Sequence, residues 1–327
     1  MKKIKTDKKY LLKRANAKWE HELDRKKKRK IKKHLKLIEK IDKIKKLRIP
    51  KKKIKAPTIF SFIENTDEII DYFNWYLKYT KKKMPIEFDL KDIEQLTFDS
   101  ISILLANIKD KKYSKSLISW NAPEKIELKN LFIKSDFYSF VNSQVKPPRD
   151  FIQWRAINHI SNKQVSPEIA WEINEEFINM NSTDKRKLYE IIIECMQNTM
   201  NHAWEWFNWW IFYYNNKERW TKEICFLDLW VWILWSLNTK FEDFADYIKD
   251  YNKDKLKQLF EWEWKKQDTI TKERKRWNWL KDIYKFAKVE AIKNFVVITN
   301  QIKADLKNDN YVKLKNNFEW TFYYWEI

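Results

Sequence analysis

Glycine is absent from all 327 residues of the sequence, whereas tryptophan occurs 19 times. Average usage of about 7% would give roughly 23 glycines in a chain of this length. Turns, helix C-caps and phosphate-binding loops draw on glycine, because it adopts positive φ without a steric cost. Its absence therefore excludes most of the tight turns with which an ordinary α/β protein closes on a ligand.

The tryptophans cluster at places that otherwise read as turns. We hypothesise that most of them are glycine in the natural product, since some bacterial lineages read the UGA codon as glycine and others as tryptophan. The abundance of Lys, Ile, Asn, Phe and Tyr fits an AT-rich gene, in which such reassignments occur, and UGG codons at these positions would exclude the hypothesis. Trp154 and Trp325 lie in apolar contexts that suit a genuine indole. The clustered pairs are Trp204 and Trp206, Trp209 and Trp210, Trp262 and Trp264, and Trp277 and Trp279.

Cysteine and long apolar runs are also scarce. The two cysteines, Cys195 and Cys225, lie inside apolar helix and strand patterns, which argues against a disulfide framework or a zinc site and fits a reducing compartment. No apolar run approaches the length of a membrane span, and the N-terminus lacks the apolar core of a signal peptide. We therefore expect a soluble, cytoplasmic protein with no transmembrane segment.

Positive charge is abundant but local. Residues 1–55 hold 26 Lys and Arg against 6 Asp and Glu, whereas the rest of the chain holds 41 against 40. Such a block is typical of an electrostatic arm for nucleic acid or another polyanion. The alternative is a solvated helix whose lysines reflect AT-rich codon drift.

The basic block carries a helical apolar stripe from residue 24 to residue 47, and Pro50 ends it. Such a basic amphipathic helix can also lie on an anionic membrane surface or against a partner helix. Residues 51–57 read as a linker, so residues 1–56 are predicted to form a basic helical arm and linker. The stripe consists of Ile31, Leu35, Ile38, Ile41, Ile44 and Leu47.

Residues 57–147 alternate short strand and helix patterns, which predicts a parallel or mixed sheet with helical crossovers. One predicted helix opens at Thr66 and a second at Phe98. The order of elements, with Asp99 and Ser100 opening the second helix, resembles the STAS fold of bacterial switch proteins, which carry an Asp-Ser before theirs. The chain departs from that pattern after Ser100. Phosphorylation of Ser100 is one reading, and an ordinary N-cap is the other.

Residues 148–327 are predicted to form the catalytic half, which begins with a connector helix opened by Ser166 and Pro167. In the next helix Glu194, Asn198 and His202 recur every four residues, which places them on one face. A helix face with a carboxylate, an amide and an imidazole is unfavourable in a hydrophobic core and typical of a functional site. The following apolar strand brings Asp228 to its C-terminal end, where open α/β sheets present ligand-binding groups.

With glycine at the Trp positions, four blocks follow in order. Together they resemble the N, G1 and G2 boxes and the terminal Gly-Thr of the GHKL superfamily, which includes histidine kinases, anti-sigma serine kinases, gyrase and the Hsp90 chaperones. The resemblance implies a two-layer α/β sandwich of the Bergerat type that binds ATP and Mg²⁺. The blocks are Glu194, Asn198 and His202; Asp228 with Trp230 and Trp232; Trp277 to Leu280; and Trp320 with Thr321.

Roles follow from chemistry and from the resemblance. The amide oxygen of Asn198 suits Mg²⁺, and Glu194, one turn earlier, suits a general base. The resemblance places Asp228 on the adenine amino group and Thr321 near the adenine. It also implies ATP contacts by His202, although this residue could instead satisfy a helix-end carbonyl.

The positions read as glycine would bring backbone close to the nucleotide. Trp230 and Trp232 would lie against the purine, and Trp277 and Trp279, with Leu280 opening a helix, would lie at the phosphates. If these residues are genuine indoles, they would fill the cleft, and we expect no ATP binding.

The expected function is Mg-ATP hydrolysis or phosphoryl transfer to a protein, by an anti-sigma-like serine kinase or an ATP-driven switch. A histidine autokinase is disfavoured, because His21, His34 and His159 lack the acidic neighbour expected beside a phosphoacceptor. The alternative is a non-catalytic nucleotide-binding scaffold whose basic arm, residues 1–55, binds nucleic acid.

Overall fold

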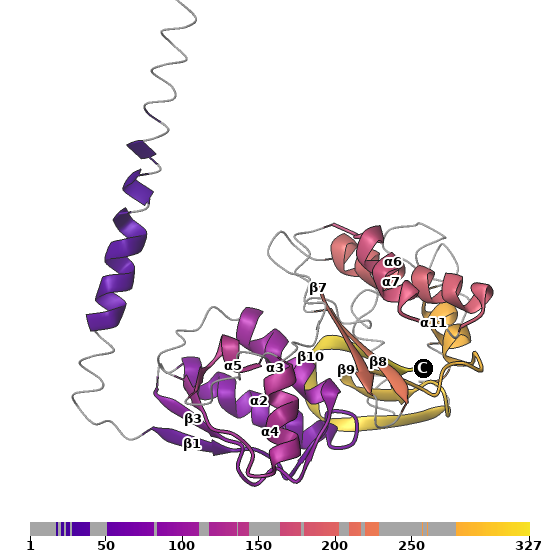
Figure 1. Cartoon of the computed structure of the whole chain (residues 1–327), viewed down its shortest axis with the longest axis horizontal. Helices are drawn as coiled ribbons and strands as arrows, with labels where there is room; N and C mark the ends of the chain where they lie inside the picture. Colours follow the sequence, from indigo (N-terminus) through magenta and orange to yellow (C-terminus); the bar gives the residue numbers. More distant parts are fainter. Residues whose placement is uncertain are drawn as a thin grey trace, which may run out of the picture. The chain divides into compact units, whose positions relative to one another are not determined.

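A computed structural model describes most of the chain, as two compact units, Met1–Lys52 and Lys53–Ile327 (Figure 1). The residues that it describes are 18, 21, 22, 24–26, 28–39, 51–81, 84–110, 118–135, 137–143, 164–177, 180–202, 209–216, 220–228, 257, 260 and 279–327.

In the first unit, residues 28–39 are helical, as are residues 18, 21, 22 and 24–26 before them. Every one of these side chains is exposed. The prediction of a helix in the basic arm is thus confirmed for its described part, and the apolar positions from Ile41 onward lie outside it.

The N-terminal half of the second unit is an α/β structure, as predicted. Its main sheet has the order β1-β3-β5-β6, in which β3, β5 and β6 run parallel, and β2 and β4 form a separate parallel pair. The elements are β1 (Lys52–Lys55), β2 (Ile59–Phe60), α2 (Thr66–Lys81), β3 (Ile86–Asp89), β4 (Gln95–Leu96), α3 (Phe98–Asp110), β5 (Ile118–Trp120), α4 (Ile126–Lys134), α5 (Phe137–Phe140) and β6 (Asn142–Ser143).

The predicted linker at residues 51–57 is wrong, because Lys52–Lys55 forms the edge strand β1. Only Ile54 of this strand is buried, and its lysines point to solvent. A lysine-rich edge discourages pairing with other chains, so a strand can form where the composition alone reads as a linker.

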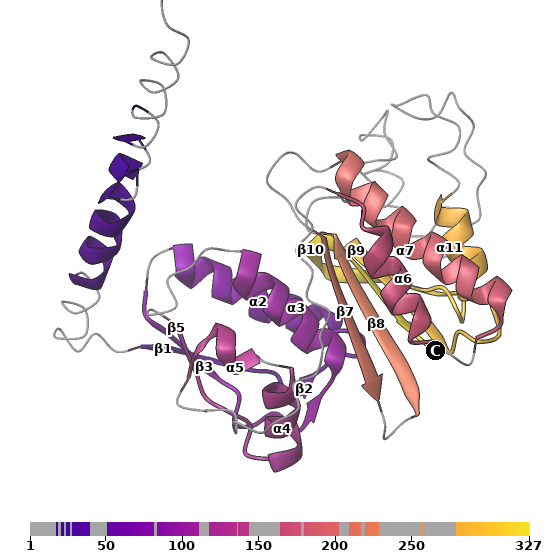
Figure 2. The same ribbon diagram turned by 45° about the horizontal axis from the view of Figure 1, so that its top comes forward.

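The C-terminal half is built on an antiparallel sheet of order β7-β8-β10-β9. Helices α6, α7 and α11 lie on one side of this sheet in both views (Figures 1 and 2). The connector helix packs beside α7, as predicted. The elements are α6 (Pro167–Glu175), α7 (Ser182–His202), β7 (Trp209–Asn216), β8 (Thr221–Asp228), α11 (Trp279–Ala287), β9 (Asn294–Asp305) and β10 (Asn310–Glu326).

Asp228 is the last residue of β8, as predicted, but the reason given for that position does not hold. The rule that ligands collect at C-terminal strand ends applies to parallel sheets. Here β7 and β10 both run antiparallel to β8, so the first residue of β7, Trp209, and an interior residue of β10, Thr321, lie beside Asp228.

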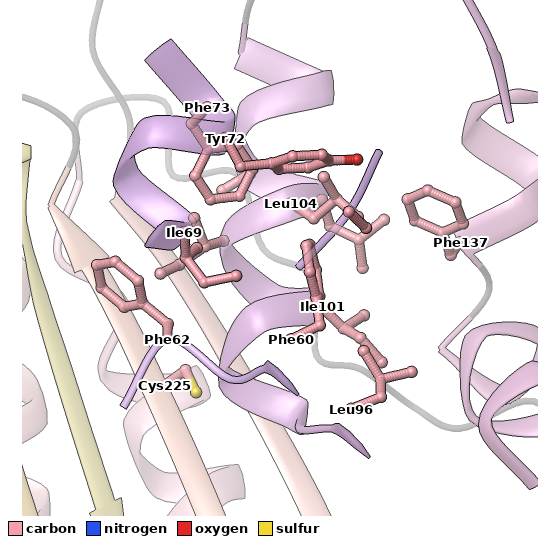
Figure 3. Close-up of a cluster of buried hydrophobic side chains, with 14 of the residues drawn as sticks. Phe60, Phe62, Ile69, Tyr72, Phe73, Leu96, Ile101, Leu104, Phe137 and Cys225 are labelled. Atoms are coloured by element: carbon pink, nitrogen blue, oxygen red, sulfur yellow. The ribbon is translucent and has the colours of Figure 1, made fainter. Parts of the chain in front are cut away.

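Successive residues of each strand alternate between two cores. On β8, Ile224 and Phe226 face the helices, and we call this the helix face of the sheet. Cys225 and Leu227 point to the opposite, back face, where they share one apolar cluster with the N-terminal half. Figure 3 shows Cys225 in this cluster together with Phe62. The back face is thus covered by the N-terminal half of the unit rather than by solvent.

The tryptophans that the structure describes differ in their surroundings. Trp209 and Trp210, which the sequence suggested as turn residues, are instead buried at the start of β7. Trp325 is fully buried and stacks on Phe295 at 5.5 Å between ring centroids, while its indole N–H has no hydrogen-bond partner among the described residues. Trp220, in contrast, is 89% exposed and has φ of 53°.

Positive φ at Trp220 yields a prediction. A bulky residue at positive φ is destabilising by about 1–2 kcal/mol, whereas glycine adopts this conformation without that penalty. We expect Trp220→Gly to stabilise the protein by about 1 kcal/mol in chemical denaturation. The control is Trp171→Gly, on the exposed face of helix α6, which should destabilise by about 1 kcal/mol because glycine is a poor helix former. Equal losses in both variants would contradict the expectation.

Candidate functional site

Three polar side chains lie in a row across neighbouring strands, beside the C-terminal end of β8. Thr321 of β10 pairs with Asp228 of β8 on one side and with Thr299 of β9 on the other. Because side chains alternate along a strand, all three lie on the helix face. Each is two residues away from a helix-face residue of its own strand, namely Phe226, Tyr323 or Val297. All are at most 2% exposed. The sequence predicted Asp228 and Thr321 as site residues, and the fold brings them together.

Thr299 was not predicted, because a lone threonine in an apolar run reads only as a strand former. Its hydroxyl lies 3.0 Å from that of Thr321 and donates to the side-chain oxygen of Asn300 at 3.2 Å. A hydroxyl has a single proton. When Thr299 donates that proton to Asn300, the Thr321 hydroxyl must donate its own proton to Thr299. The lone pairs of the Thr321 oxygen then point away from Thr299.

Helix α7 covers this end of the sheet and carries Glu194 and Asn198. The apolar side of α7 packs against the helix face through Leu188, Ile191 and Ile192. At the margin of this contact, Glu194 and Asn198 are half-buried. Burial raises the pKa of the Glu194 carboxyl, and the nearby charges of Asp282 and Glu190 raise it further. The carboxyl therefore holds a proton more readily than an ordinary glutamate does.

The buried thiol of Cys195 connects α7 with the strand end. Burial raises its pKa first, and the negative charges of Glu194 and Asp228 add to the effect. Burial also raises the pKa of the Tyr323 hydroxyl, and the charges of Cys195 and Asp228 raise it further. Both predicted carboxylates thus lie close enough to one buried group to act on it electrostatically.

Helix α11 packs against α7. Leu280, at its start, is buried, and Ile283 and Phe286 continue the buried face. Asp282, in its first turn, contributes to the raised pKa of Glu194, so the beginning of α11 lies near the Glu194 carboxyl. The predicted helix at Leu280 is confirmed, with bounds Trp279–Ala287.

Several predicted site residues lie outside the described part. Trp230, Trp232 and Trp277 are outside the described residues altogether. His202 ends α7 and Trp279 begins α11, but their side chains are outside the description.

Oxygen donors suited to magnesium are present at Glu194 and Asn198. Within the described ranges, no group of three or more His, Cys, Asp or Glu could hold a metal ion. Mg²⁺ is often held through only one or two protein oxygens together with substrate phosphates. The half-buried Asn198 amide beside the Glu194 carboxyl fits that kind of site rather than a cage made of protein ligands alone.

The back face of the sheet holds Ser100, the other residue that the sequence singled out. Ser100 is fully buried near the start of α3, which packs on β8 and β7. The buried carboxyl beside it, Asp99, acts electrostatically on Cys225, a back-face residue. The sheet therefore separates Ser100 from Asp228. Asp99 itself accepts the backbone N–H of Ile63 at 2.9 Å, which is a structural task.

A cavity of about 250 Å³ adjoins the back face and was not anticipated. Its wall includes Asp99, Glu223, Glu326, Glu64 and Lys134. Burial raises the pKa of Glu223, with Asp99 and Glu326 adding to the shift, while hydrogen bonds from Asn216 and Tyr324 oppose it. The Asn216 amide donates to Glu223 at 2.9 Å.

Glu223 gives a pH-dependent prediction. Because its folded pKa is raised, its stability contribution is present below the unfolded value of about 4.3 and is lost as pH rises through the folded value. Glu223→Gln should therefore be more stable than the wild type above that window, by about 1 kcal/mol, a typical size for one substitution. The difference should vanish toward pH 4. Denaturation of wild type, Glu223→Gln and the exposed control Glu94→Gln across pH 4–8 tests this, and a constant difference at every pH would refute it.

Comparisons with known proteins add no identity to this geometry. Neither protein-family models, nor curated proteins, nor solved structures gave a match to the chain. Among the described helices, none is both long and apolar enough to cross a membrane.

Proposed function

We propose that the chain is an ATP-binding protein of the GHKL type that hydrolyses Mg-ATP or transfers its γ-phosphoryl group to a protein. The observation that carries the proposal is the buried pair Asp228 and Thr321, side by side on adjacent strands beneath the helix that bears Glu194 and Asn198. The residues proposed to contact the adenine and those proposed to act at the phosphates thus lie on the same side of one sheet.

The C-terminal end of β8 would recognise the adenine base. A carboxylate can only accept hydrogen bonds, so Asp228 suits the exocyclic amino group of adenine and disfavours the oxygen that guanine carries in its place. The Thr321 hydroxyl, with its proton directed to Thr299, adds a second acceptor beside it. This arrangement favours ATP over GTP.

The phosphates would lie toward α7 and α11. The Asn198 amide oxygen would hold Mg²⁺, which supplies charge neutralisation on the phosphates. Glu194 would accept the proton of the attacking water or hydroxyl, and its raised pKa improves it as a base near neutral pH. The N-terminus of α11 would offer free backbone N–H groups to a phosphate.

The phosphoryl acceptor in this proposal is water or a partner protein, rather than Ser100. Ser100 is fully buried and on the other side of the sheet from Asp228. Transfer to it would require the two halves to separate, because their cores form one apolar cluster. The resemblance of the N-terminal half to STAS switch proteins therefore suits a regulatory cover better than a substrate.

Thr299 provides a test of the adenine end in the glycine version of the chain, which carries glycine in place of Trp230, Trp232, Trp277 and Trp279. Thr299→Val keeps the shape but removes the hydroxyl that orients Thr321, and we expect ATP affinity to fall about fivefold, the equivalent of about 1 kcal/mol for one neutral hydrogen bond. Thr299→Ser should restore it. The control is Thr221→Val, at the far end of β8, where the buried hydroxyl has no hydrogen-bond partner among the described residues.

The experiment that tests the whole proposal is a titration of this glycine version with ATP and with GTP in the presence of Mg²⁺, followed by a turnover assay. Saturable binding of ATP, with weaker binding of GTP, is expected. Binding without turnover would favour the scaffold alternative, and no binding of either nucleotide would refute the proposal.

A further inference from the structure

The N-terminal helix combines strong positive charge with exposed apolar side chains. Residues 25–36 contain nine Lys and Arg and no Asp or Glu. Within the helical residues 28–39, Ile31 is 58% exposed, Leu35 54% and Ile38 41%. Their spacing of four and three places them on one face, and we call these three residues the apolar stripe.

This helix lacks the packing that normally stabilises a short helix. Helices of about 12 residues are marginal in water unless an amphipathic face is buried. Every described side chain of the first unit is exposed, so no described residue of that unit covers the apolar stripe. A surface that buries the stripe would therefore also stabilise the helix.

We propose that residues 28–39 bind the surface of an anionic lipid bilayer, with the apolar stripe inserted at the boundary between headgroups and acyl chains. The flanking lysines would pair with lipid phosphates while their aliphatic stems cover apolar surface. The charge of the helix complements a membrane that carries acidic lipids, and a neutral membrane would offer only the three apolar contacts.

The apolar stripe also favours a lipid surface over two other binding partners, nucleic acid and a second copy of the helix. Nucleic acid would satisfy the lysines but leave Ile31, Leu35 and Ile38 in water. A second copy of the helix would cover the stripe but would bring two blocks of like charge together, which is unfavourable. The lipid surface satisfies both features, since it is anionic outside and apolar beneath.

Co-sedimentation of the full-length protein with lipid vesicles tests the proposal. We expect binding to vesicles of phosphatidylcholine with phosphatidylserine, and at least tenfold weaker binding to phosphatidylcholine alone. The double variant Leu35→Gln and Ile38→Gln keeps the charge and the helix propensity. It should bind the anionic vesicles at least tenfold more weakly than the wild type does.

The matched control is Leu37→Gln, because Leu37 is exposed but lies off the apolar stripe. It should bind as the wild type does, and circular dichroism should show a gain of helix on adding anionic vesicles to both. Undiminished vesicle binding by the double variant would overturn the proposal, because charge alone would then explain it. Binding to duplex DNA in the absence of any binding to anionic vesicles would overturn it as well.

Discussion

Replacing Glu194 by glutamine in the glycine version of the chain should lower ATP turnover by roughly 10²–10⁴-fold, the range expected when a general base is lost. Glutamine has nearly the same shape but cannot accept the proton of the attacking water. ATP affinity should change little, because the proposed binding contacts of Asp228, Thr321 and Asn198 remain. Steady-state phosphate release and equilibrium ATP binding, measured on the same preparations, separate the two effects.

The control for this variant is Glu190→Gln, one turn earlier on α7. Glu190 is exposed and forms an ion pair with Arg186 at 2.9 Å, so its loss should leave turnover at neutral pH unchanged. Because the Glu190 charge raises the pKa of Glu194, the acid limb of the pH profile should move to lower pH in this variant. Turnover that survives in Glu194→Gln would remove Glu194 from the mechanism.

Replacing Asp228 by asparagine in the glycine version should weaken ATP binding by at least tenfold, because a hydrogen bond to a charged group contributes about 1.5–3 kcal/mol. An amide can also donate toward the oxygen of guanine, so the preference for ATP over GTP should shrink as well. Loss of affinity through unfolding is not expected, since Asp228 is a buried carboxylate and asparagine is neutral and similar in size. Paired titrations with ATP and GTP, together with a denaturation curve, measure all three.

Glu223→Gln is the matched control for Asp228→Asn. Glu223 is a buried carboxylate on the same strand, but it lies on the back face, at the cavity. Its neutralisation should leave ATP affinity unchanged. Equal loss of affinity in the two variants would point to a general effect of charge on β8 rather than to recognition of adenine by Asp228.

The elements with strong local patterns could be predicted from the sequence. The amphipathic pattern around Glu194 gives α7, and the apolar run before Asp228 gives β8. Strand β9 was missed, as was the first part of β10, because the turn between them contains neither glycine nor proline. That turn instead places Asp309 at φ of 52°, a conformation that aspartate tolerates better than most residues do.

Residues whose role depends on distant pairing could not be predicted. Lys52–Lys55 becomes a strand only because β3 offers a partner, and nothing in its lysine-rich sequence indicates this. Thr299 joins the candidate site only because β9 pairs with β10 opposite Thr321. The covered back face is a third case, since the apolar alternation of β8 does not say which segment covers each side.

The hypothesis that tryptophan stands in place of glycine takes a more definite form in the structure. Trp220 has the backbone conformation that favours glycine, whereas Trp325 has the packing that favours an indole. Mass spectrometry of peptides from the natural protein would identify the residue at each position. We expect glycine at position 220 and tryptophan at position 325.

Binding of Mg-ATP to two versions of the chain tests the central claim most directly. One version carries glycine at Trp230, Trp232, Trp277 and Trp279, and the other has the sequence as printed. Calorimetric titration should show saturable binding of one ATP per chain in the glycine version, at least tenfold weaker binding when Asp228→Asn is added to it, and none in the printed sequence. Absence of binding in the glycine version, or binding that Asp228→Asn leaves intact, would contradict a nucleotide site at this end of the sheet.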